Sequence, residues 1–212
     1  PTFTPTPTST PTFTPTPTPT TTPVVVAIQS AASATGYVMS LELLKNHFGS
    51  SAMWAGEIPQ GAGRGKWYAT VQFDLSDIPP QADIISAEVE LRGAPARYQF
   101  LSPGAGGRWQ LRLLGSGVDL GWLGLSYYDI AVLAEVEETI GPTVSYADFG
   151  EGVVNTFPFS EAQLGALEER LGTTGKASFR VDYTATVRGL FRDLYAWDAA
   201  APPILRITYR VP

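Results

Sequence analysis

Apolar and polar residues alternate along several segments of the chain, with the period of two that is typical of half-buried β-strands. Residues 66–75 show the fullest pattern, and the apolar side chains predicted to share one face are Trp67, Ala69, Val71, Phe73 and Leu75. Residues 84–92 repeat it, and the side chains predicted to face the core are Ile85, Ala87, Val89 and Leu91. Shorter alternating runs predict strands over residues 108–113, 179–183 and 205–210.

The first strongly apolar segment is an uncharged, mostly β-branched run made of Val24, Val25, Val26, Ala27 and Ile28. It shows no alternation, which is typical of a strand buried on both faces. Because it follows a long leader, this strand is predicted either to complete the sheet of its own chain or to add to the sheet of a neighbouring copy.

Two segments depart from the strand pattern. Ser160 and Gly172 are predicted to cap a helix whose apolar residues are Leu164, Leu167 and Leu171. Residues 128–139 fit either a helix or a strand, and we expect a short helix there. About nine or ten strands with one or two short helices predict an all-β fold over residues 24–212, a β-sandwich of jelly-roll type.

Residues 1–23 contain 8 Pro, 12 Thr, 2 Phe and 1 Ser, too little apolar variety for a packed core. Pro at alternate positions favours an extended polyproline II form that spans about 70 Å at roughly 3.1 Å per residue. The segment is therefore predicted to be a Thr/Pro-rich extended arm or linker. Its threonines are candidate O-glycosylation sites: Thr2, Thr4, Thr6, Thr8, Thr10, Thr12, Thr14, Thr16, Thr18, Thr20, Thr21 and Thr22.

Composition and charge limit the classes of function and partner that the sequence allows. Charged residues make up 16% of the chain, against roughly 25% in an average soluble domain, so the surface relies on Thr, Ser, Gly and Gln, as in extracellular β proteins. The net charge is −6 and the 14 basic residues are scattered, which argues against nucleic acid as a partner. No stretch approaches the ~20 apolar residues of a membrane span. The lack of Cys and the single His exclude thiol nucleophiles, disulfides and Cys/His zinc sites.

Candidate catalytic groups are few. His47 lies in a polar turn, where a solvated side chain is expected, and the chain lacks the Gly-x-Ser-x-Gly elbow of serine hydrolases. The acidic residues that lie close together in sequence are expected to be solvated charges: Glu137, Glu138, Glu168, Glu169, Asp148 and Glu151. We therefore predict no catalytic residue, no metal site and no cofactor.

Residues 71–91 resemble the φ-x-F-D-L-S-x-I-P-x-x-A-x-I-x-S-A-x-L-x-L signature of DNRLRE-type domains, which are extracellular bacterial and archaeal β-sandwiches that include carbohydrate-binding modules. Residues 34–38, 46–49 and 202–209 are similar to further landmarks of that family, although the first lacks the family's Asp. The resemblance implies a secreted or cell-surface β-sandwich. It implies no binding residue, because the matching residues form a strand and its connection.

Aromatic residues make up 11% of the chain, and exposed aromatic faces stack on sugar rings. Trp67 and Trp109 lie on apolar faces and are expected to be core residues. The candidates for a sugar-binding or partner-binding patch are Trp54, Tyr68, Trp197, Trp122, Tyr127 and Tyr128. The last three belong to an apolar loop between glycines, and we expect this loop to expose a surface that binds a glycan or a protein.

Assembly is the function that we expect. An apolar strand tethered to a long arm, in a chain without catalytic groups, indicates a structural subunit of an extracellular or cell-surface filament that binds other copies of itself. The alternative is a carbohydrate-binding module on a Thr/Pro stalk.

Overall fold

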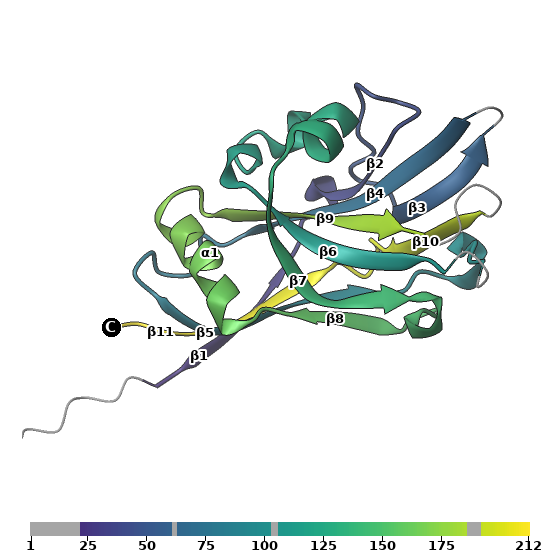
Figure 1. The fold of residues 1–212 in the computed structure, drawn as a ribbon. Coiled ribbons are helices and arrows are strands. Elements are labelled where there is room, and N and C mark those ends of the chain that lie inside the picture. Colours follow the sequence, from purple (N-terminus) through teal and green to yellow (C-terminus); the bar gives the residue numbers. More distant parts are fainter. Residues whose placement is uncertain (1–21, 61–62, 103–105, 186–191) are drawn as a thin grey trace, which may run out of the picture.

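A computed structural model of the chain describes residues 22–60, 63–102, 106–185 and 192–212. It contains two packed antiparallel sheets, which confirms the predicted all-β sandwich (Figure 1). The strands within the described residues are β1 (Val24–Gln29), β2 (Thr35–Met39), β3 (Ala52–Gln60), β4 (Gly63–Asp74), β5 (Asp83–Arg92), β6 (Arg108–Leu114), β7 (Val136–Ser145), β8 (Val154–Pro158), β9 (Lys176–Thr184), β10 (Asp193–Asp198) and β11 (Ile204–Arg210).

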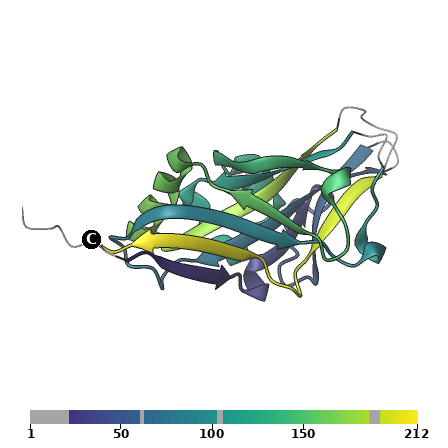
Figure 2. The same ribbon diagram turned by 90° about the horizontal axis from the view of Figure 1, so that it is seen from below.

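The smaller sheet has the strand order β1-β11-β5-β8, and Figure 2 shows β1, β11 and β5 side by side. The larger sheet has the order β10-β3-β4-β9-β6-β7, and β2 pairs with β4. The first and last strands of the domain are therefore neighbours. β1 begins at Val24, where the predicted domain begins, and the C-terminus lies at the same end of the sandwich (Figure 1).

The core lies between the two sheets, where the predicted apolar faces meet. The alternating apolar residues of β4 from Trp67 to Phe73 are all buried, as is Leu75 directly after the strand. Trp109 is fully buried on β6, and its indole Nε1 donates a hydrogen bond to the Ala55 carbonyl at 2.9 Å. The faces predicted for these two strands are therefore correct.

The predicted face of β5 is wrong at its first residue. Ile85 is 38% exposed, whereas Ile84 is buried. The register with β11 explains the difference, because Thr208 lies opposite Ser86 while the next residue, Tyr209, lies opposite Ile84. Ile85 is the extra residue of a β-bulge, and beyond a bulge the side chains change face.

β1 is a strand, as predicted, but it is not buried on both faces. It lies at the edge of the smaller sheet and pairs with β11 alone. Val26 and Ile28 pack on the core, whereas Val25 is 68% exposed. A run of β-branched residues predicts that a strand forms. The burial of that strand depends on which other strands pack beside it.

The predicted helix is α1 (Glu161–Gly172), and its N-terminus carries the expected cap: Ser160 and Gln163 form a capping box. The predicted C-cap is wrong, because Gly172 is the last helical residue and the left-handed glycine is Gly175, with φ +64°. The Gly175 N–H donates to the Arg170 carbonyl at 2.7 Å, which closes the helix.

Residues 128–139, whose sequence fits either a helix or a strand, form one of each. Its first half is a single π-helical stretch, η6 (Tyr128–Leu133), and its second half begins strand β7 at Val136. None of the helices in the described part of the chain has the length and apolar character needed to cross a lipid bilayer.

Candidate functional site

The candidate assembly site is the outer edge of β1. From Val24 opposite Tyr209 to Gln29 opposite Ile204, β1 pairs with β11 on one side, and no described strand pairs with its other side. Such an edge presents unpaired backbone N–H and C=O groups, which can pair with another chain. The arm is attached directly to this strand, through the exposed residues Thr22 and Pro23.

Hydrogen bonding at the end of β1 shows which amides point outward. The Ser30 N–H donates to the Pro203 carbonyl of the chain leading into β11 at 3.0 Å. Because successive N–H groups of a strand point to opposite sides, the N–H groups of Val26 and Ile28 also point toward β11. The N–H groups of Val25 and Ala27 therefore point to the free edge, and their side chains are exposed on the outer face of the sheet.

A groove runs beside this edge. One part has a volume of about 620 Å³ and is lined by residues 26–29 of β1 together with Asp74, Ser76 and Asp77. A second part, of about 360 Å³, shares Gln29 and Asp74 with the first and continues past residues 119–123. The groove gives an extended segment room beside β1, and its polar wall offers carboxylate and hydroxyl oxygens.

The predicted glycosylation sites can be placed in only one case. Thr22 is exposed, and the threonines of residues 1–21 lie outside the described residues.

The structure corrects the predicted aromatic patch. Trp122 is 1% exposed, and Tyr127 and Trp197 are buried as well. The Trp122 indole Nε1 donates to the Ala34 carbonyl at 2.9 Å, and its ring stacks on Phe48 with centroids 5.3 Å apart. The loop between glycines folds the rings of Trp122 and Tyr127 inward, so neither of these two rings offers a face to a sugar.

The remaining members of that patch are separated. Tyr68 is half-buried against Tyr127, and burial raises the pKa of its hydroxyl to about 12. The Arg180 guanidinium lies 5.5 Å from the centre of the Tyr68 ring and occupies one of its faces. Tyr128 is 46% exposed.

Trp54 belongs to a different aromatic cluster, which the sequence pattern did not reveal. Its ring stacks on Phe100, with centroids 5.9 Å apart, and meets the edge of Tyr98 at 5.7 Å. The cluster rests on a floor of small buried residues: Ala52, Ala94 and Ala196. Tyr98 and Phe100 lie in an irregular segment that reaches this face because Phe100 bridges to Leu194 on β10.

Polar groups surround the aromatic cluster. The Arg97 guanidinium lies 4.7 Å from the centre of the Tyr98 ring, and its hydrogen bond and charge lower the pKa of the Tyr98 hydroxyl. The Glu151 carboxylate accepts a hydrogen bond from the Ala96 N–H at 3.2 Å, which holds the short helix η2 (Ala96–Tyr98) in place. Aromatic rings beside hydrogen-bonding groups are suited to a sugar.

The other candidates for chemistry have structural contacts. His47 stacks on Tyr37, with ring centroids 4.5 Å apart, and its Nε2 lies 3.1 Å from a carboxylate oxygen of Glu42. Asp148 caps a turn by accepting hydrogen bonds from the N–H and hydroxyl of Ser145 at 2.7 and 2.9 Å. No group of three or more His, Asp or Glu side chains within the described residues is arranged to hold a metal ion.

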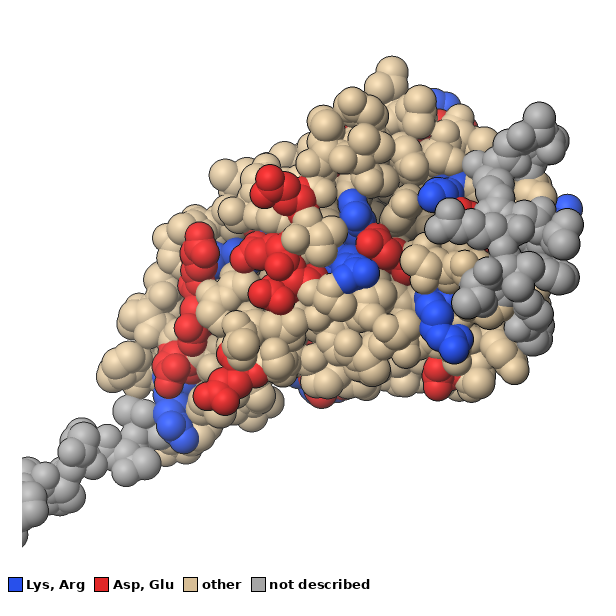
Figure 3. All heavy atoms as spheres, viewed as in Figure 1, with Lys and Arg blue, Asp and Glu red and all other residues tan. Residues whose placement is uncertain are grey.

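The acidic residues that lie close together in the sequence make contacts within the domain. Glu137 binds a buried arginine, Arg170, and Glu138 accepts a hydrogen bond from Gln163 at 3.2 Å. Glu168 accepts a hydrogen bond from the Ile84 N–H at 2.8 Å. Figure 3 shows acidic side chains gathered over the half of this face that carries α1, which opposes the binding of a polyanion there.

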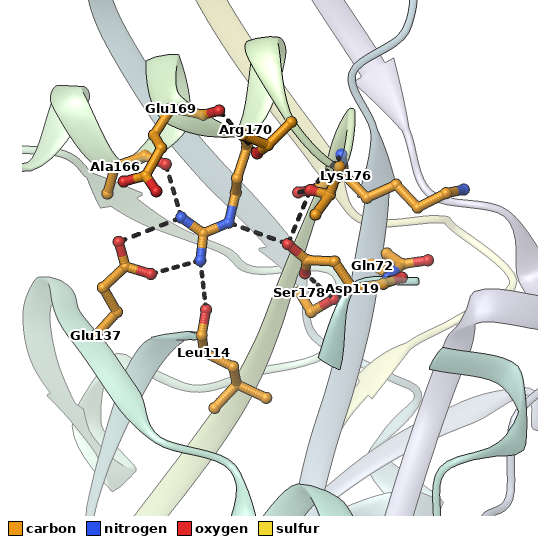
Figure 4. A network of polar contacts seen from close by, with 11 residues as sticks. Gln72, Leu114, Asp119, Glu137, Ala166, Glu169, Arg170, Lys176 and Ser178 are labelled. Carbon is orange, nitrogen blue, oxygen red and sulfur yellow. Dashed lines mark hydrogen bonds and ion pairs between the residues drawn. The ribbon is translucent and has the colours of Figure 1, made fainter. Parts of the chain in front are cut away.

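Arg170 is the centre of a buried polar network that the sequence pattern did not predict (Figure 4). Its side chain is 1% exposed, with Nη2 at 2.6 Å from Glu137 and Nε at 3.3 Å from Asp119. It also donates to the carbonyls of Leu114 and Ala166 at 2.5 and 2.6 Å. The network ties α1 to the larger sheet, because Leu114 belongs to β6 and Glu137 to β7.

Asp119 is the buried acid of this network. It accepts hydrogen bonds from the hydroxyls of Ser178 and Thr174 at 2.7 and 3.1 Å. Burial nevertheless raises the pKa of its carboxyl, because desolvation outweighs the hydrogen bonds and the nearby charge of Arg170.

Comparison with known proteins adds no assignment, since no family model matches the chain and no curated protein matches it.

Proposed function

We propose that this protein is a non-enzymatic structural subunit of an extracellular or cell-surface filament, assembled through its N-terminal arm and strand β1. The free edge of β1 carries the proposal. It combines outward-pointing amides, an exposed valine and a direct connection to the Thr/Pro-rich arm. An uncovered edge of this kind favours pairing with another chain.

The place of the arm in the sequence supports a head-to-tail contact. The arm precedes β1, and β1 begins at one end of the sandwich (Figure 1). A contact between this arm and a different surface of a second copy is heterologous, and heterologous contacts that do not close into a ring build open filaments. The resemblance of residues 71–91 to DNRLRE-type domains supports a secreted prokaryotic protein. Threonines of the arm are then accessible for O-glycosylation.

A charge placed on the free edge tests the proposal. Val25 is already exposed, so Val25→Lys should leave the isolated domain folded, whereas a lysine on the edge strand disfavours pairing with another chain. The matched control is Val154→Lys on β8, the opposite edge of the same sheet, where the valine is also exposed. We expect sedimentation and electron microscopy to show loss of filaments for Val25→Lys alone. Equal effects of the two substitutions would contradict an interface at β1.

Carbohydrate binding is the second candidate function, and the Trp54–Tyr98–Phe100 cluster favours it. Stacked aromatic rings on a rigid alanine floor, with Arg97 alongside, provide both stacking and hydrogen bonding for a sugar. Retention of the protein on immobilised polysaccharides, with Phe100→Ala as the variant, tests this function separately from assembly.

A further inference from the structure

The arm has a two-faced pattern that matches the geometry of β1. Every even-numbered position from 2 to 20 is Thr. The odd-numbered positions from 1 to 19 are Pro, apart from Phe3, Ser9 and Phe13. In an extended strand, even and odd positions differ in two respects: their side chains point to opposite faces, and their N–H groups point to opposite edges. A strand formed by the arm therefore has an N–H donor at every threonine along one edge, whereas the other edge has donors only at Phe3, Ser9 and Phe13, because Pro has no N–H.

We propose that the arm of one copy adds as a strand to the free edge of β1 in a second copy, with its threonine amides in the ladder and its prolines directed away from it. Pro is tolerated in a sheet where its nitrogen faces away from the neighbouring strand. The alternation places every proline of residues 1–19 in that position at once. The inference rests on the proposed function and specifies the partner of the β1 edge.

The orientation of the two faces agrees with this pairing. The free-edge amides of β1 belong to Val25, Ala27 and Gln29, whose side chains are exposed on the outer face. In an antiparallel pair, residues opposite each other point to the same face. Threonines paired with these residues therefore point to solvent, and the prolines and phenylalanines of the arm point to the core side.

The groove beside this edge is lined by residues 26–29 of β1 and by Asp74, Ser76 and Asp77. Val26 and Ile28 line it, and prolines or phenylalanines of the arm would extend the apolar surface of these two residues. Each copy of the repeated segment, residues 1–8 and 11–18, is longer than the six residues of β1. The solvent-facing threonines remain accessible to a glycan in this arrangement.

The same pattern explains why such an assembly stops growing sideways. Once added, the arm presents an outer edge at which the proline positions have no N–H group to offer. At these positions the edge offers carbonyl acceptors but no N–H donors to a further strand. Addition of a second strand to this edge is therefore disfavoured. Growth is directed along the chain of subunits, from one arm to the next domain.

Three variants of the arm, made in the full chain, distinguish strand addition from binding as a polyproline II helix and from binding through hydroxyls or glycans. The first replaces Thr4, Thr6, Thr14 and Thr16 with Pro, which removes ladder donors and preserves extension. The second replaces Pro5, Pro7, Pro15 and Pro17 with Ala, which leaves those donors in place. The third replaces the same four threonines with Val, which preserves the N–H groups but removes hydroxyls and any attached glycan.

We expect the Thr→Pro variant to raise the critical concentration for assembly about tenfold or more, because several paired amides are lost. The Pro→Ala and Thr→Val variants should assemble within about threefold of the unmodified chain, since a factor of three corresponds to less than one hydrogen bond. A Thr→Pro variant that assembles normally, together with a weakened Pro→Ala variant, would show that the arm binds as a polyproline II helix and would overturn strand addition. Failure of the Thr→Val variant would assign the contact to hydroxyls or glycans and would also overturn it.

Ala27→Pro tests the receiving edge. The substitution removes an outward-pointing amide but no N–H that points toward β11, so the domain should fold and assembly should be lost. Normal assembly of a folded Ala27→Pro protein would overturn the pairing with β1. If Val25→Lys and deletion of residues 1–21 still abolish filaments, the proposed function stands and the strand inference alone has failed. If both also assemble, the proposed function has failed as well.

Discussion

Replacing Arg170 with Met is expected to destabilise the domain strongly. The guanidinium is 1% exposed and pairs with Asp119, whose side chain is fully buried. Removing the arginine leaves that carboxylate in the interior without its counter-charge, and breaking a buried pair in this way costs about 3–5 kcal/mol of the free energy of unfolding. For a domain of this size the loss corresponds to a fall of about 6–20 °C in Tm.

Thermal and urea denaturation followed by circular dichroism measure this loss. Adding Asp119→Asn to Arg170→Met should restore about half of it, because the second change removes the stranded charge. Arg206→Met is the matched control, since Arg206 forms a more exposed pair with Glu90 at 2.6 Å, whose loss is expected to change the free energy of unfolding little. A loss below about 1 kcal/mol for Arg170→Met, or no rescue by Asp119→Asn, would refute the reasoning.

Three further predictions follow from local contacts. Hydrogen bonds from Ser126 lower the pKa of Asp129 below its ordinary value of 3.8. The stability that the Asp129 carboxylate contributes is therefore fully present above pH 3.8 and is lost as the pH falls through the lowered pKa, so the Tm difference between the unmodified chain and Asp129→Ala should shrink across that range. Gly141→Ala should cost more than the about 1–2 kcal/mol expected for Gly175→Ala in chemical denaturation, because both glycines have positive φ but only at Gly141 would a Cβ meet the Phe157 backbone, at 2.6 Å. If the second candidate function holds, Phe100→Ala should lower retention on the bound polysaccharide about tenfold without changing the assembly state, and unchanged retention would count against this aromatic cluster.

The pattern of apolar and polar residues within a single segment was sufficient to predict features that depend on that segment alone. The alternation of β4 identified its buried face, and the Ser160 capping box identified the start of α1. The bulge at Ile85 was not predictable, because it depends on the register between β5 and β11, which are more than a hundred residues apart in sequence. The edge position of β1 depends in the same way on strand order rather than on its own residues.

In the candidate sites too, features of a single segment were predictable from the sequence, whereas contacts between distant segments were not. The apolar strand at residues 24–28 was visible in the sequence because it needs no partner to be recognised. Trp122 was misplaced because its burial depends on Ala34 and Phe48, which a distant segment supplies. Tyr98 joins Trp54 only after the irregular segment before Phe100 crosses to β10, and no periodic pattern marks that crossing.

Electron microscopy of the full chain, with the form lacking residues 1–21 as its partner sample, tests the central claim most directly. The account predicts regular filaments from the full chain, built from subunits of 22.7 kDa plus any attached glycan, and single particles from the shortened chain. Dispersed monomers of the full chain at every concentration, or filaments that persist without the arm, would contradict it.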